Sequence, residues 1–220
     1  MKKLDRKQMA ARVARDIPEG SYVNLGIGLP TLVADFLPAS GKSGREIIVH
    51  SENGVLGVGP KPAPGEEDED LINAGKEPVT LLTGGCYFHH ADSFGMIRGR
   101  HLDFAILGAF QVSAAGDLAN WHTGAPDAIP AVGGAMDLAV GAKKVLVMME
   151  HLTKSGESKI VERCTYPLTG ARCVDRIYTD LAVIDVKADG LHVVDVVENL
   201  SFEELQRLTG VPLKRLASAA

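Results

Sequence analysis

The carboxylate of Glu52 is the side chain whose surroundings most clearly suit chemistry. Residues 47–49 before it are apolar and β-branched, as is typical of a buried strand, and Asn53-Gly54 after it favours a turn. Glu52 is therefore expected at the carboxyl end of a strand, where open α/β sheets bind their ligands. A carboxylate there is destabilising unless it is paired or used. The pattern fits a catalytic role and a structural hydrogen-bonding role equally well.

Two glycine-containing segments predict places where backbone N–H groups could meet a ligand. Residues 22–25 are expected to form a strand that leads through Gly26 and Gly28 into a helix. Gly133 and Gly134 precede a second, short helix. Unpaired N–H groups at such helix starts favour anions. The first segment lacks the full glycine pattern of a dinucleotide site or a P-loop, and tight strand-to-helix packing explains its glycines equally well.

Two other groups of polar residues could serve as ligands. His89, His90 and Asp92 are of metal-ligating types, but adjacent histidines point in different directions and no further cluster completes a set. No metal is therefore expected. Glu150 and His151 follow a buried strand, where they either face a ligand or form a satisfied pair, and the pair is the expected arrangement.

Composition limits the class of protein. The chain has 220 residues, of which 45% are hydrophobic and 23% charged, so one soluble domain spanning 1–220 is expected. The net charge of −5 argues against nucleic acid as a partner, and no apolar stretch has the roughly 20 residues of a membrane span. The amino-terminal residues lack a signal-peptide pattern. Three cysteines without metal-type spacing suit free thiols, so a cytoplasmic location is expected.

The elements that would position these side chains alternate between helix and strand. A helix is expected around 10–17, and buried strands at 79–82, 102–112 and 144–149. Turn-rich links are expected at 38–44 and 126–130. Two strands at 177–186 and 191–196 form a hairpin across an Asp-Gly turn. A last helix begins with a capping box of Ser201 and Glu204. The fold class is α/β, with a largely parallel central sheet flanked by helices and a closing hairpin and helix.

The motif Ser51-Glu52-Asn53-Gly54 resembles that of the β subunit of the two-subunit 3-oxoacid coenzyme A-transferases. In that family it carries a glutamate nucleophile. The likeness extends over nearly the whole chain, and further segments match in the same order, namely 24–30, 71–76, 92–94, 116–121, 133–138 and 173–176. Gly95 and Arg100 depart from the alanine and glycine expected there.

The resemblance implies a mechanism and a partner. Glu52 would take coenzyme A from succinyl-CoA through a covalent glutamyl-CoA thioester, with coenzyme A as substrate and covalent intermediate and no tightly bound cofactor. Gly133 and Gly134 would supply backbone donors to the oxyanion, with Ser51, Asn53 and Gly54 in support. Residues 55, 56 and 58 would exclude water or simply pack in the core. An α subunit of related fold would complete the site, in a 2:2 heterotetramer.

Residues 121–127 and 88–90 are most similar to family members that act on 3-oxoadipate in the β-ketoadipate pathway of aromatic breakdown. His89, His90 and His122 are therefore candidates to recognise the substrate. An acetoacetate transferase is the nearest alternative. An acyl-CoA hydrolase would resolve the same intermediate with water, and a non-catalytic binding protein would keep the fold alone.

Overall fold

The computed structural model describes residues 2–37, 46–125 and 131–215, so the links expected at 38–44 and 126–130 lie outside the described residues. Most strands belong to one large sheet: β1 (Tyr22–Leu25), β2 (Ile48–Ser51), β3 (Val55–Val58), β4 (Leu81–Tyr87), β5 (Phe104–Leu107), β8 (Lys144–Met148), β10 (Val174–Tyr178), β11 (Ala182–Lys187), β12 (Gly190–Val196) and β13 (Leu213–Arg215). A small second sheet contains β6 (Gln111–Ser113), β7 (Leu118–Ala119) and β9 (Ile160–Val161). The helices are α1 (Arg6–Arg15), the 3-10 helix η1 (Leu29–Phe36), α2 (His90–Arg98), α3 (Ala135–Gly141) and α4 (Phe202–Leu208).

The large sheet is parallel in its middle and has antiparallel pairs on either side, with the edge strand β13 again parallel to β12. Its strand order is β13-β12-β11-β10-β8-β5-β1-β2-β3-β4. The five strands from β10 to β2 run parallel to one another, while β3 and β4 on one side and β11 and β12 on the other pair antiparallel. The predicted α/β class, with a central parallel sheet, a late hairpin and a last helix, is confirmed.

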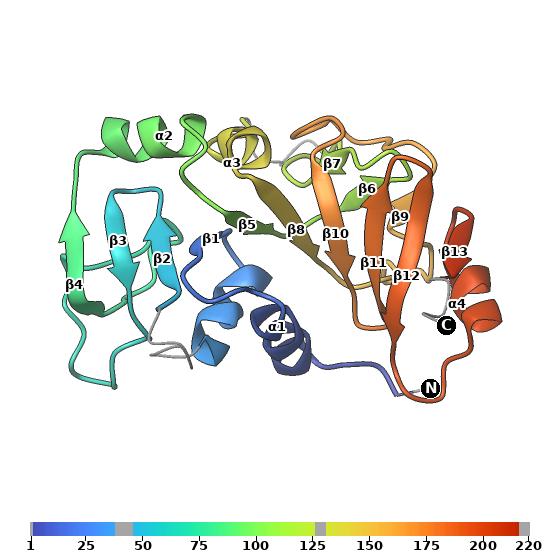
Figure 1. The fold of residues 1–220 in the computed structure, drawn as a ribbon, viewed down its shortest axis with the longest axis horizontal. Helices are drawn as coiled ribbons and strands as arrows, with labels where there is room; N and C mark the ends of the chain where they lie inside the picture. Colours follow the sequence, from blue (N-terminus) through green and yellow to red (C-terminus); the bar gives the residue numbers. More distant parts are fainter. Residues whose placement is uncertain (1, 38–45, 126–130, 216–220) are drawn as a thin grey trace.

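Helices cover both faces of this sheet (Figure 1). In the figure, α2 and α3 lie above it, and α1 and η1 lie below it. Buried side chains alternate between the two layers as the period of two requires: Ala105 and Leu107 pack in the core with α2 and α3, and Ile106 packs with α1 and η1. These inner strands are apolar on both faces because both faces are covered. Truncating fully buried Ile106 to alanine would therefore destabilise the fold by about 2–5 kcal/mol.

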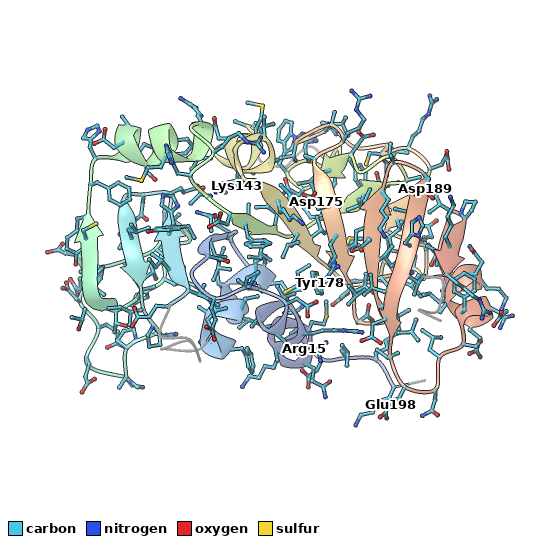
Figure 2. All side chains as sticks on the ribbon, viewed as in Figure 1. Arg15, Lys143, Asp175, Tyr178, Asp189 and Glu198 are labelled. Carbon is cyan, nitrogen blue, oxygen red and sulfur yellow. The ribbon has the colours of Figure 1, made fainter. Side chains whose placement is uncertain are left out.

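Helix α1 is attached to the sheet by a polar contact at its carboxyl end. Asp16, its C-cap residue, accepts a hydrogen bond of 2.9 Å from the buried Tyr178 hydroxyl, which points from β10 towards α1 (Figure 2). Arg176 lies 3.4 Å from the same carboxylate and also donates to Asp185. Burial raises the pKa of Tyr178, so its hydroxyl stays a hydrogen-bond donor. This network joins the first helix to the hairpin side of the sheet.

Four local predictions differ from the structure. The segment 102–112 is two strands in two sheets, because the chain leaves the large sheet after β5. The segment 177–186 likewise splits between β10 and β11, which are antiparallel neighbours. The helix after Gly28 is a 3-10 helix that begins with a proline in its first turn. The strand expected at 79–82 to be buried is instead β4, which is partly exposed because it is an edge strand paired with β3.

The amphipathic first helix and the last helix agree with the prediction. Met9, Ala10, Val13 and Ala14 form the buried face of α1. The Ser201 hydroxyl accepts from the Glu204 N–H, which is the predicted capping box of α4. None of the helices among the described residues is long and apolar enough to cross a bilayer.

Candidate active site

Glu52 lies directly after β2, at its carboxyl end, as the sequence predicts. It is half-buried and lines a cavity of about 740 Å³. The cavity also receives residues that follow three other parallel strands: Gly26 after β1, Gly108 after β5 and Glu150 after β8. Open α/β sheets bind ligands at this edge because the loops after parallel strands meet there. The topology therefore places Glu52 on one wall of a ligand-sized space.

The start of α3 lies against the Glu52 carboxylate. A Cβ atom built on Gly134 would lie 3.0 Å from Oε1 and 3.1 Å from Oε2 of Glu52, and 2.9 Å from Cζ of Phe94. Gly134 is the N-cap of α3 and makes no side-chain cap, while Gly133 has a φ of +61°, where glycine is favoured. The start of α3 and the Glu52 carboxylate, which are far apart in the sequence, thus meet at one place.

Burial and nearby charge shift the acidity of this carboxylate. Removal from water raises the pKa of Glu52, the positive field of His90 opposes that rise, and Asp137 adds to it. Asp137 is itself paired with Arg98, whose Nε lies 2.7 Å from the Asp137 carboxylate. A carboxylate with a raised pKa is more basic and less solvated than one in water, and both properties favour attack on a carbonyl.

The neighbours of Glu52 hold its turn in place. The Ser51 hydroxyl accepts a hydrogen bond of 2.9 Å from the Ala74 N–H, and the Asn53 amide donates to the Ile72 carbonyl at 2.8 Å. Gly54 has a φ of +115°, and a Cβ there would lie 2.2 Å from the Phe88 carbonyl oxygen. This position therefore requires glycine, and the turn is fixed to the segment 71–76.

Strand β2, which precedes Glu52, contains a buried histidine, His50, that was not predicted from the sequence. His50 is 1% exposed, and its Nδ1 lies 3.1 Å from the Asn24 amide nitrogen and its Nε2 3.0 Å from the Ser93 hydroxyl. The Asn24 amide also donates to the His50 carbonyl, so its NH₂ group faces the histidine. Nδ1 must then accept, and Nε2 carries the proton and donates to Ser93. Burial lowers the pKa of His50 to about 4, which keeps the ring neutral.

Comparisons with known proteins decide the family. The Coenzyme A transferase family model matches residues 6–207. The chain belongs to the coenzyme A transferase family. It is 68% identical over 212 residues to the B subunit of 3-oxoadipate CoA-transferase from Pseudomonas putida, covering 96% of this chain and 97% of that protein. It is 48% identical over 204 residues to the B subunit of the probable succinyl-CoA:3-ketoacid coenzyme A transferase of Bacillus subtilis, covering 93% and 92%.

A solved structure supports the fold of this coenzyme A transferase chain. The apoenzyme of the acyl-CoA transferase YdiF from Escherichia coli O157:H7 superposes with a TM-score of 0.74 at 18% identity. The match covers 97% of this chain and 43% of the YdiF chain, so this chain spans less than half the length of that neighbour. At this identity the likeness concerns the fold alone.

The remaining predictions for this transferase concern the glycine loop after β1 and the apolar residues that follow Glu52. Gly26 lines the cavity, and a Cβ there would lie 3.0 Å from the Ile106 carbonyl oxygen, so close packing against β5 explains this glycine. Gly28 has a φ of +88° and does not line the cavity. Val55 and Val58 belong to a small core cluster and so serve packing, and Leu56 is half-buried on β3.

The three histidines predicted to recognise the substrate differ in their position relative to Glu52. His90 lies close enough to Glu52 to influence its pKa, whereas the His89 ring caps α2 by accepting from the Ala91 N–H. The His122 ring accepts from the Gly124 N–H and does not line the cavity. Residues 126 and 127 of the segment matched for substrate type lie outside the described residues.

The expected pairing of Glu150 with His151 is wrong. Glu150 lines the cavity, but His151 is fully buried and its ring contacts the hydroxyls of Thr179 and Thr209 at 3.1 and 3.0 Å. The two side chains separate because successive residues of an extended chain point to opposite sides.

Two predictions about the chain as a whole concern metal binding and the state of the cysteines. Within the part of the chain that is described, no group of three or more His, Cys, Asp or Glu side chains is placed to hold a metal ion. All three cysteines are free thiols, as predicted. Trp121, from the segment matched for substrate type, also lines the cavity, while Phe110 and Lys159 on the same wall were not predicted as site residues. A lone lysine before a short strand carries no motif, so local pattern could not single out Lys159.

Proposed function

We propose that this chain is the catalytic subunit of an enzyme that transfers coenzyme A from succinyl-CoA to 3-oxoadipate. The observation that carries the proposal is the half-buried Glu52 carboxylate, in contact range of Gly134 at the wall of a 740 Å³ cavity. The high identity to a relative named as the B subunit of 3-oxoadipate CoA-transferase supports the choice of substrates. We also propose a cytoplasmic location, which the three free thiols support, and a role in the breakdown of aromatic compounds.

The first half-reaction loads coenzyme A onto the enzyme. The Glu52 carboxylate attacks the thioester carbonyl of succinyl-CoA, which breaks the C–S bond, forms a succinyl-glutamyl anhydride and releases the coenzyme A thiolate. The thiolate then attacks the glutamyl carbonyl of the anhydride, which releases succinate and leaves a glutamyl-CoA thioester. No general base is required, because the attacking groups are already anions.

The second half-reaction reverses these steps with the other acid. A carboxylate of 3-oxoadipate attacks the glutamyl-CoA thioester, forming a new anhydride and freeing the thiolate. The thiolate attacks the 3-oxoadipyl carbonyl, which releases 3-oxoadipyl-CoA and restores the Glu52 carboxylate. Each attack places negative charge on a carbonyl oxygen, and N–H groups at Gly133 and Gly134 are the proposed donors to it. Loss of one such donor typically reduces the rate by about 10²–10³-fold.

The proposed enzyme includes an α subunit in a 2:2 assembly. Exposed apolar side chains on the cavity wall and on α3 support a partner that covers them: Ile27 on the wall is 69% exposed, and Met136 and Val140 on α3 are 49% and 63% exposed. Large apolar side chains that stay exposed together are typical of interaction surfaces. Covering the cavity would also protect an anhydride from water.

The decisive experiment traps the intermediate. The assembled α/β enzyme is incubated with succinyl-CoA, treated with borohydride and digested for peptide mass analysis. Reduction of a thioester on Glu52 leaves an alcohol at that residue alone. A Glu52→Gln enzyme, treated in the same way, is the control and should carry no alcohol. An unmodified Glu52 peptide from an enzyme active in transfer would overturn the nucleophile assignment.

An acetoacetate transferase is the second candidate, because the 48% identical relative bears a succinyl-CoA:3-ketoacid name. The ratio of kcat/KM for 3-oxoadipate to that for acetoacetate separates the two. A ratio well above one supports our proposal, and a ratio below one favours the alternative. Coenzyme A release as fast without an acceptor acid as with one would instead indicate a hydrolase.

A further inference from the structure

A lysine with no assigned role lines the same cavity as Glu52. Lys159 lies just before β9, and its backbone N–H donates to the His151 carbonyl at 3.0 Å, beyond the end of β8. In the sheet, β1 and β5 separate β2 from β8. Three spacings of about 4.8 Å place β8 about 14 Å from β2. Lys159 and Glu52 therefore lie on well-separated walls of one space.

The ammonium group of Lys159 lacks a direct partner. Neither a hydrogen bond nor an ion pair joins its Nζ to any residue in 2–37, 46–125 or 131–215. The side chain is half-buried, and this burial lowers its pKa, while the carboxylates of Glu150 and Asp180 act in the opposite direction. A half-buried cation without a partner is destabilising, and an incoming carboxylate would relieve that penalty.

Of the two carboxylates that act on Lys159, Asp180 is engaged elsewhere, while the half-exposed Glu150 makes a long contact with Arg6. Asp180 lies 3.2 Å from the Lys3 ammonium and accepts from the His151 N–H. The other cation on the cavity wall, Arg6, has a side chain 74% exposed and lies 4.0 Å from Glu150. Lys159 is thus the more shielded of these two cations and the one without an ion pair.

We propose that Lys159 binds the distal carboxylate of the dicarboxylic acyl group while the near carboxyl reacts at Glu52. The proposal rests on the function proposed above and deepens it by naming the specificity residue. Both side chains line the cavity, and the ends of β2 and β8 near them are roughly 14 Å apart, a separation that two side chains with an acyl chain of four to six carbons between them can bridge. The flexible four-carbon stem of a lysine lets one ammonium serve both succinyl and 3-oxoadipyl groups.

The test compares two acceptors that differ only at the distal end, 3-oxoadipate and 3-oxohexanoate, with the assembled α/β enzyme and succinyl-CoA as donor. Lys159→Gln should lower kcat/KM for 3-oxoadipate by about 10- to 100-fold, mainly through KM, and leave 3-oxohexanoate within about 3-fold. Lys159→Arg keeps the charge and should recover much of the loss. Lys154→Gln, an exposed lysine in the same loop, is the matched control and should change neither value.

The outcomes separate this proposal from the proposed function. An equal loss for both acceptors would show a structural role for Lys159, and no loss for either would show no role; both results overturn the inference. A selective loss in Arg6→Gln instead would assign the subsite to Arg6 and also overturn it. Unmodified enzyme that fails to use 3-oxoadipate would refute the proposed function. The donor pair succinyl-CoA and butyryl-CoA would then still test Lys159, since only the first has a distal carboxylate.

Discussion

Substitution of Gly134 by alanine tests the contact between α3 and the Glu52 carboxylate. The backbone of Gly134 has φ −68° and ψ −12°, a conformation that alanine adopts freely, so Gly134→Ala adds a methyl group without backbone strain. Ordinary van der Waals contact begins at 3.4 Å, and the new methyl would lie 3.0 and 3.1 Å from the two carboxylate oxygens. Either the carboxylate or α3 must therefore move by a few tenths of an ångström.

The expected result is a loss of turnover with little loss of stability. A misplacement of about 1 Å at a reacting group reduces the rate by about 10²-fold, so we expect kcat to fall by about 10- to 100-fold. The methyl would also lie 2.9 Å from Cζ at the tip of the half-buried Phe94 ring, so the free energy of unfolding should fall by about 1 kcal/mol, the low end for an added methyl group in a packed region. Steady-state transfer from succinyl-CoA and urea unfolding measure the two quantities.

Gly95→Ala is the matched control for this experiment. Gly95 lies in the interior of α2 next to Phe94, and a Cβ there meets no atom within 4 Å. The same chemical change should preserve activity and stabilise the helix by about 0.5–1 kcal/mol. Full activity in Gly134→Ala, or an equal loss in Gly95→Ala, would refute the contact as the cause.

Three further predictions follow from the titrating groups of the site and core. Burial raises the pKa of Glu52, so at pH values above the ordinary glutamate pKa the folded state binds more protons than the unfolded state. The ionised carboxylate therefore destabilises the fold at neutral pH. Glu52→Gln should therefore abolish transfer yet raise the Tm, and a lowered Tm would contradict this sign. The pKa values of His50 and His151 are lowered to about 4, so both rings are neutral in the folded state where the unfolded state is protonated. As the pH drops below about 6.5, each histidine should lower the free energy of unfolding by up to about 1.4 kcal/mol per pH unit, and urea unfolding between pH 7 and 5 measures this loss. Ser93→Ala leaves the His50 Nε2–H without its acceptor and should lower the free energy of unfolding by about 1–3 kcal/mol; an unchanged value would refute a stabilising hydrogen bond between these two side chains.

The sequence by itself determined the features that depend on neighbouring residues. The strand before Glu52 and the turn after it follow from a β-branched run and Asn-Gly, and the last helix begins at its predicted capping box. The α/β class followed from the alternation of apolar strands with helices, since both faces of the inner strands had to be covered. Family membership followed from the ordered motifs and is shown by the comparisons.

The tertiary structure alone decided which distant residues meet. Gly134 contacts Glu52 because α3 packs beside α2 over the end of β2, and nothing in either segment specifies that neighbour. The hydrogen-bond partners of His50 come from β1 and α2, which strand pairing and helix packing bring together in the core. The edge position of β4 and the unpaired Lys159 in the cavity depend likewise on strand order. Local pattern determines an element, while long-range packing determines the surroundings that set a side chain's charge and reactivity.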